Sequence, residues 1–251
     1  MTLPFRDRHE AGRQLAEKLY EAHGPSTLVL GLPRGGVPVA WSIAHMLHAP
    51  LDVFLIRHLA PVEEPDAVFG CIGSGGVRIV RYDEARRYGL GSVGVDEVTR
   101  RERISLLARE RTYRGQVVER EYRDQTVLLV DDGSATRQQL AEAVALLRQH
   151  EPRRIILAVP ILSVDDAETL RAVVDLLVTV AEPTEVGGID RWYVEYDRYS
   201  TDPARAEQLL TDAGVDDLSL EILVASDYPE TVTAAQVMES QLAEAGITLT
   251  I

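Results

Sequence analysis

Short apolar runs and helical repeats alternate along this chain. Continuous apolar runs are typical of strands buried on both faces, whereas apolar residues three and four positions apart are typical of amphipathic helices. The runs predict strands at residues 27–32, 51–57, 77–81, 127–130, 154–160 and 175–180. The helical spacing predicts helices at residues 8–22, 37–48, 95–113, 137–150, 165–173 and 203–213. This alternation implies an α/β fold with a mostly parallel central sheet flanked by helices.

Two segments depart from this alternation. Residues 59–76 are rich in Gly, Pro and acids, and their length favours a mobile active-site loop over a plain connection. No helix follows their glycines at once, which disfavours a dinucleotide-binding loop. A last β–α–β pattern covers residues 218–225, 230–245 and 247–251. We therefore expect a main domain at residues 1–215 and a C-terminal extension at residues 216–251, to which the sequence assigns no role.

The strand at residues 127–130 ends in two adjacent acids, Asp131 and Asp132, and a turn of small residues then opens a helix. The carboxyl ends of parallel strands face a crevice, where a helix N-terminus offers unpaired N–H groups to a phosphate. Carboxylates near solvent there can accept hydrogen bonds from ribose hydroxyls and hold Mg²⁺ directly or through water. The pattern therefore suits a ribose 5-phosphate carried with Mg²⁺. A simpler interpretation is that the acids only cap the helix.

This segment resembles the motif of type I phosphoribosyltransferases that binds 5-phosphoribosyl 1-pyrophosphate (PRPP). The motif has an apolar run, two acids, Gly, two variable residues, Thr, Gly, a small residue, and Thr or Ser. The match holds through Thr136 and then fails, because Arg137 replaces Gly and Gln139 replaces Thr or Ser. Since the glycine and the hydroxyl help to seat a phosphate, we expect weak PRPP binding.

A second segment makes the resemblance more specific. Pro33, Arg34, Gly35 and Gly36 form a predicted tight turn between a strand and a helix. Glycines let the backbone approach an anion, and an Arg can bridge two of its oxygens. Together with its neighbours, this turn is similar to a group of predicted bacterial and archaeal phosphoribosyltransferases of undefined substrate, over about residues 5–210. The resemblance implies a pyrophosphate-binding turn with a cis peptide bond between Pro33 and Arg34.

The resemblance implies a set of site residues at the ends of the strands. The candidate catalytic residues are Asp131, Asp132 and Arg34, and the two acids are also the candidate Mg²⁺ ligands. The candidate phosphate-binding residues are Gly133, Ser134, Ala135, Thr136, Arg137, Gln138 and Gln139. The candidate pyrophosphate-binding residues are Pro33, Arg34, Gly35, Gly36, Arg57 and His58. His58 departs from the group, which has Lys at that position, and a lone His after a strand is more often structural.

The resemblance also implies a hood, a small lobe that closes over the acceptor. The N-terminal segment and about residues 182–200 would form it, and the second segment carries Trp192, Tyr193, Tyr196 and Tyr199. These rings suit stacking on a planar acceptor, although packing within the lobe is their more frequent role. The implied ligands are PRPP or a nucleoside monophosphate, and pyrophosphate. A homodimer is compatible with the resemblance.

Composition limits the partners and the compartment. A chain of 251 residues can bury one substantial core, or a core plus a small lobe. Its formal charge of -14 argues against nucleic acid or an anionic membrane as the main partner. Cys71 is alone, which excludes an intrachain disulfide and fits a reducing compartment. The N-terminus lacks an apolar signal core, so we expect a cytoplasmic protein.

Other protein classes that use paired acids fit less well. A response-regulator receiver needs a further Asp and a Lys at later strand ends, which here read Val159-Pro160 and Val180-Ala181. A haloacid-dehalogenase-type phosphatase needs Asp-x-Asp, and position 133 is Gly.

Two hypotheses about function remain. The first is a Mg²⁺-dependent phosphoribosyltransferase, in which an acceptor attacks C1 of PRPP and pyrophosphate leaves. The second is a catalytically impaired homologue that binds a nucleotide or phosphosugar in a regulatory role. The intact acids and pyrophosphate turn favour the first hypothesis, whereas the altered phosphate loop favours the second.

Overall fold

The computed structural model describes residues 3–24, 26–114, 121–196, 203–215, 218–222, 239, 242–243 and 246–250. The chain divides into two compact units, Met1–Tyr196 and Asp197–Ile251. The candidate site residues all belong to the first unit. The boundary expected between residues 215 and 216 stays a prediction.

A five-stranded parallel sheet forms the centre of the first unit. Its strand order is β2-β1-β6-β7-β8. The strands are β1 (Thr27–Gly31), β2 (Leu51–Val53), β6 (Thr126–Val130), β7 (Arg154–Ala158) and β8 (Leu176–Val178). β1 and β6 pair in register from Thr27↔Thr126 to Gly31↔Val130, so both strands end at the same edge. The expected α/β fold with a parallel central sheet is confirmed.

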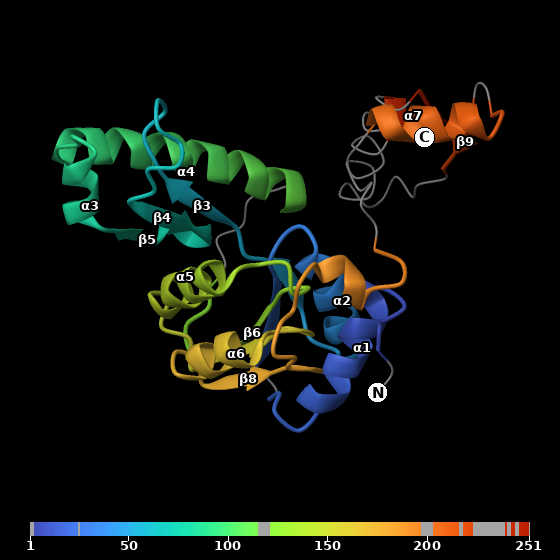
Figure 1. Ribbon diagram of the computed structural model, residues 1–251, viewed down its shortest axis with the longest axis horizontal. Coiled ribbons are helices and arrows are strands. Elements are labelled where there is room, and N and C mark those ends of the chain that lie inside the picture. The colour runs from blue at the N-terminus through green and yellow to red at the C-terminus, as the bar shows by residue number, and fades with distance from the viewer. Residues whose placement is uncertain are drawn as a thin grey trace. The chain divides into compact units, whose positions relative to one another are not determined.

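Helices cover both faces of this sheet. Figure 1 shows α1 (Arg8–Leu19) and α2 (Gly36–Leu47) on one face, and α5 (Arg137–Arg148) and α6 (Val164–Arg171) on the other. Successive side chains of a strand point to opposite faces. Leu128 and Val130 of β6 accordingly join the core with α1 and α2, whereas Val127 and Leu129 join the core with α5 and α6. Burial on both faces explains the continuous apolar runs that predicted these strands.

A second, antiparallel sheet corrects two predictions. Its strands β3 (Ile56–Leu59), β4 (Gly70–Gly73) and β5 (Arg78–Val80) pair in the order β3-β4-β5. The single strand predicted at residues 51–57 is therefore wrong, because residues 51–53 belong to the central sheet and residue 56 begins another. The loop predicted at residues 59–76 contains β4 and a short 3₁₀ helix, Ser74–Gly76. The antiparallel sheet packs beside α3 (Tyr82–Arg87) and the long α4 (Ser92–Arg114), and α3 was not predicted.

Buried side chains bind the backbone of Val53, the last residue of β2. The carboxylate of Asp52 accepts the N–H of Val53 at 2.8 Å, and Arg114 donates to the Val53 carbonyl at 2.8 Å. Arg114 also donates to Asp52 at 2.7 Å, and both side chains are buried. These bonds give the backbone of Val53 side-chain partners on the edge of the sheet, because β2 is an edge strand.

Two ion pairs join β3 to its surroundings. Arg57 donates to Glu102 of α4 at 2.7 and 2.9 Å. His58 forms a hydrogen bond with Glu142 of α5 at 3.2 Å. The hydrogen bond with Glu142 raises the pKa of His58. Burial alone would raise the pKa of Glu142, but hydrogen bonds from His58 and Gln138 and nearby positive charge lower it.

The second unit contains α7 (Pro203–Asp212) and two strands, β9 (Ser219–Glu221) and β10 (Thr248–Thr250), which pair in parallel. The predicted helix at residues 203–213 is confirmed. Most of the predicted helix at residues 230–245, and Tyr199, lie outside the described residues. In the part of the chain that the structure describes, no helix is long and apolar enough to cross a membrane.

We predict that Gly12→Ala destabilises the first unit. A Cβ at Gly12 would lie 2.5 Å from the Val39 carbonyl oxygen and 2.7 Å from the Ser42 Cβ, so α1 and α2 would have to separate. Overpacking of this kind costs about 1–3 kcal/mol of unfolding free energy. Chemical denaturation measures the loss. The control is Gly24→Ala, whose Cβ would have no neighbour within 4 Å, and equal stability of the two variants would contradict the prediction.

We also predict a pH-dependent contribution of the His58–Glu142 pair to stability. Because the folded-state pKa of His58 is raised, the pair stabilises the fold below the unfolded-state pKa of about 6.5. This contribution is lost as pH rises through the raised pKa, and also as acid protonates Glu142. The difference in Tm between wild type and His58→Gln should therefore be largest near pH 5–6 and shrink at alkaline pH. A difference that stays constant from pH 5 to pH 9 would contradict the prediction.

Candidate active site

The acid pair lies at the end of β6 and is buried. Asp131 is 4% exposed and Asp132 is 0% exposed, so the expectation that both acids lie near solvent is wrong. Their oxygens accept backbone N–H groups of the loop that follows. Asp131 Oδ1 accepts from Gly133 at 2.8 Å and from Ala135 at 3.1 Å, and Asp132 Oδ1 accepts from Ser134 at 3.1 Å. The acids therefore fix the conformation of the loop.

Burial changes the proton affinity of the pair. Desolvation, followed by the charge of Asp132, raises the pKa of Asp131, while the loop N–H groups oppose the shift. Two carboxylates that share a buried position disfavour double ionisation. A ligand that brings positive charge or hydroxyl donors to this edge would relieve their repulsion.

The predicted pyrophosphate turn lies directly against the acids. The peptide bond between Pro33 and Arg34 is cis, which confirms the expected position. A Cβ at Gly35 would approach the Asp132 carboxylate well inside 3.0 Å, and a Cβ at Gly36 would lie 2.5 Å from the Val130 carbonyl oxygen. Only glycine fits at these two positions without displacing the acid strand. The structure thus brings together the turn after β1 and the acids after β6.

The predicted phosphate loop uses its own side chains as acceptors. Thr136 begins α5 with a capping box, in which its hydroxyl accepts the N–H of Gln139 and the Gln139 side chain accepts the N–H of Thr136 at 2.9 Å. The N–H groups of residues 133–136 therefore all have acceptors within the loop and the first turn of α5. Arg137 forms an ion pair with Asp166 at 3.6 Å, and Gln138 donates to Glu142 at 3.2 Å.

Gln139 thus has a structural reason to differ from the family motif, because Gln at the third helical position completes a capping box. A phosphate that bound here would compete with this box for the N–H of Thr136. The guanidinium of Arg137 is half exposed and is paired with α6. It is not folded over the loop.

Arg57 and His58 belong to β3 in the antiparallel sheet, not to the edge that holds the acids. Their ion pairs are with Glu102 and Glu142. A part in pyrophosphate binding stays a prediction for these two residues.

The N-terminal segment and residues near 193 meet at the acid strand. Phe5 forms a parallel bridge with Tyr193, and its N–H donates to the Trp192 carbonyl at 2.8 Å. Tyr193 is buried, and its hydroxyl donates to the backbone carbonyl of Asp132 at 2.7 Å. Of the aromatic residues predicted for the hood, Tyr193 is therefore packed in the core and connects its segment to Asp132. The indole of Trp192 donates to the Val186 carbonyl at 2.8 Å.

Arg8 is a site residue that sequence reasoning missed. Its Nε donates to Asp132 Oδ2 at 2.8 Å, and its guanidinium lies 4.4 Å from the ring centre of Tyr196. Arg8 lies within residues 5–210, over which the family resemblance extends, but its spacing gave no sign that it reaches an acid 124 residues away.

The two carboxylates at this edge are donors of the kind that Mg²⁺ prefers. Carboxylate oxygens are the hard donors that Mg²⁺ prefers, and Mg²⁺ commonly takes its remaining ligands from phosphates and water. Among the described residues, no group of three or more His, Cys, Asp or Glu side chains could hold a metal ion by itself. Asp131 and Asp132 are therefore the described side chains at this edge that would contribute oxygen ligands to a Mg²⁺ ion, with water or a bound molecule supplying the rest.

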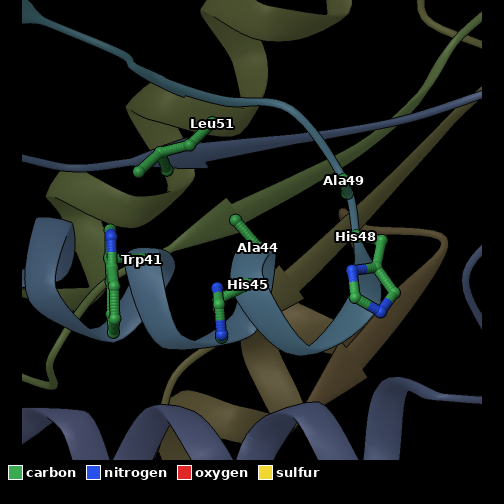
Figure 2. A pocket seen from close by; sticks show the side chains of 6 residues that line it. All are labelled: Trp41, Ala44, His45, His48, Ala49 and Leu51. Carbon is green, nitrogen blue, oxygen red and sulfur yellow. The ribbon is translucent and has the colours of Figure 1, made fainter.

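A shallow pocket lies elsewhere on α2 (Figure 2). Trp41, Ala44, His45, His48, Ala49 and Leu51 line it, and its volume is about 290 Å³. The rings of Trp41 and His45 stack with 5.3 Å between their centres. The pocket lies toward the C-terminal end of α2, whereas the turn at Gly35 and Gly36 begins that helix. It is therefore separate from the acid pair.

Comparison with known proteins agrees with this architecture. The model of the phosphoribosyl transferase domain matches residues 6–180. A model of the middle part of bacterial extracellular solute-binding proteins, family 5, matches residues 161–251, which is less than half of the chain. The crystal structure of TT1426 from Thermus thermophilus has 31% sequence identity and a TM-score of 0.64, and the match covers 77% of this chain and 92% of that one.

Curated relatives from two strains of Mycobacterium tuberculosis, CDC 1551 / Oshkosh and H37Rv, bear the names "Putative phosphoribosyl transferase MT0597" and "Putative phosphoribosyl transferase Rv0571c". Each is 34% identical over 247 residues, which covers 96% of this chain and 54% of the relative. The chain thus spans about half the length of these relatives. The similarity continues beyond residue 210, where the resemblance by motifs ended. The domain match and the arrangement of the acid strand and its facing turn lead to one conclusion: the chain belongs to the phosphoribosyl transferase domain family.

Proposed function

We propose that this protein transfers ribose 5-phosphate from PRPP to an acceptor in a Mg²⁺-dependent reaction. The observation that carries the proposal is the close packing of Gly35 and Gly36 on Asp132 and Val130. It supports a single crevice in which two acids and an anion-binding turn face one ligand. PRPP has the matching chemistry, because it carries two ribose hydroxyls and a pyrophosphate on the same sugar.

Each element has a distinct part in the proposed reaction. Asp131 and Asp132 accept hydrogen bonds from the ribose hydroxyls and fix the position of C1. The turn at residues 33–36 binds the pyrophosphate, through backbone N–H groups and Arg34. A bond from the acceptor to C1 forms as the bond from C1 to the pyrophosphate oxygen breaks. Bound Mg²⁺ would neutralise charge on the leaving pyrophosphate. The contribution of the protein is therefore mainly positioning and electrostatic stabilisation.

The proposal is tested with the carboxylate that contacts the turn. Asp132→Asn should weaken Mg²⁺-dependent PRPP binding at least tenfold in calorimetry, because the amide removes the charge that ribose and metal share. Asp83→Asn is the matched control, since Asp83 is exposed and forms an ion pair with Arg86 on α3. A thermal unfolding curve establishes that both variants fold. PRPP binding that is equal in wild type and Asp132→Asn, or absent in wild type, would overturn the proposal.

A second candidate function is favoured by the phosphate loop. The N–H groups of residues 133–136 already have acceptors, so a 5-phosphate gains less there than in an open cradle. This observation supports an impaired homologue that binds a nucleotide or phosphosugar in a regulatory role. Binding of PRPP or a nucleoside monophosphate, without release of pyrophosphate in the presence of candidate acceptors, would favour this function.

We predict that Arg137→Gly combined with Gln139→Thr tightens PRPP binding at least tenfold. The double variant removes a Cβ at residue 137, opens the capping box and supplies a hydroxyl. Loss of the hydrogen bond from the Thr136 N–H to the Gln139 side chain costs about 1 kcal/mol of stability, which thermal unfolding would detect separately. Gln139→Glu is the control, because Glu at that position preserves the box and adds no phosphate donor. Unchanged or weaker binding of PRPP and Mg²⁺ by the double variant would contradict the prediction.

A further inference from the structure

Arg8 supplies a positive charge inside the acid pair. The guanidinium lies 2.8 Å from Asp132 Oδ2, and the exposed fractions of the two side chains are 14% and 1%. The other oxygen of Asp132 accepts the N–H of Ser134, and the backbone of Gly35 lies against the carboxylate. Asp132 is thus enclosed by its loop, the turn and Arg8. Of these three contacts, the one with Arg8 is made by a long side chain, so rotation of that side chain alone would expose Asp132 Oδ2.

Two aromatic rings hold Arg8 in this position. The guanidinium lies 4.4 Å from the ring centre of Tyr196 and 5.7 Å from that of Tyr193. A cation over an aromatic face is stabilised, more strongly where water is excluded. Tyr193 is itself fixed, because its hydroxyl donates to the Asp132 carbonyl. The rings therefore favour a state in which Arg8 stays on Asp132.

The position of Arg8 bears directly on ligand binding. A ribose hydroxyl or a magnesium ion needs an oxygen of Asp132, and Arg8 already donates to one. A buried carboxylate that loses its cation is costly unless another cation or donor replaces it. An arriving Mg²⁺ and ribose would supply that replacement. Arg8 and the ligand would therefore bind the carboxylate of Asp132 alternately.

We propose that Arg8 is a positioning residue that occupies Asp132 in the absence of ligand and lowers the affinity of the acid pair for divalent cations. The proposal deepens the proposed function and rests on it only in taking the acid pair as the ligand site. It assigns the N-terminal segment a part in regulating the site.

The alternative hypothesis, that Arg8 has a purely structural role, predicts a different result. If Arg8 only docks α1 on the sheet, its removal lowers stability and leaves the cation affinity of the acids unchanged. Cation affinity is therefore the informative measurement. The probe is Mn²⁺, which binds oxygen ligands as Mg²⁺ does and is detected by electron paramagnetic resonance when free.

Mn²⁺ is titrated into the full chain without PRPP. We expect Arg8→Gln to bind Mn²⁺ at least tenfold more tightly than wild type, because Asp132 loses the cation that is paired with its Oδ2. Arg8→Lys retains a positive charge and should stay within about threefold of wild type. Arg6→Gln is the matched control, since Arg6 lies in the same segment and its ion pair with Glu195 is exposed. The gain should disappear in the double variant Arg8→Gln, Asp132→Asn.

A second variant covers the case in which Arg8→Gln does not fold. Tyr196→Leu keeps the charge of Arg8 but removes the nearer ring, and should raise Mn²⁺ affinity by about threefold. Equal Mn²⁺ affinity in wild type, Arg8→Gln and Tyr196→Leu would overturn the proposal. So would a gain that persists without Asp132.

The outcome is separable from that of the proposed function. Tighter Mn²⁺ binding by Arg8→Gln together with no PRPP binding by any variant would support the part of Arg8 and refute PRPP as ligand. PRPP binding that depends on Asp132, together with a Mn²⁺ affinity that is unchanged in Arg8→Gln, would support PRPP as ligand and refute the part of Arg8.

Discussion

The site depends on the close approach of a backbone turn to a buried carboxylate. β1 and β6 are neighbours in register, so the chain leaves both strands at the same edge of the sheet. The turn after β1 then packs on Asp132 at a distance that leaves no room for a side chain at Gly35. Were that residue larger, its side chain would collide with the carboxylate and the turn could not lie against the acids. The geometry of the edge thus follows from parallel pairing and the absence of two Cβ atoms.

Burial of two adjacent carboxylates requires compensation, and the structure supplies it from three directions. The loop donates its own N–H groups, Arg8 donates from α1, and Tyr193 fixes the backbone from the hood. Charged groups without such partners would destabilise the fold. The same contacts that stabilise the acids therefore hold the N-terminal segment and Tyr193 against the end of β6.

The sequence was sufficient for the central sheet and for the two loops that carry the resemblance. Strands such as β6 are buried on both faces, and a continuous apolar run is a strong local signal for that environment. The run at residues 51–57 was misleading because two strands of different sheets, β2 and β3, follow each other there without a polar residue run between them. β4 was not predicted because it lies in a glycine-rich segment and is stabilised by pairing with β3 and β5, which the local sequence does not indicate. Arg8 was missed for a similar reason, because its partner lies far along the chain.

The environment of Cys71 has a practical consequence. It is the single cysteine of the chain and lies in β4, where it is fully buried. Burial raises the pKa of its thiol to about 12, so the reactive thiolate is scarce at neutral pH. A maleimide or nitroxide reagent would therefore leave Cys71 unmodified in the folded protein. Cysteines introduced at exposed positions could be labelled selectively in the otherwise native sequence, so distances within the first unit could be measured by spectroscopy.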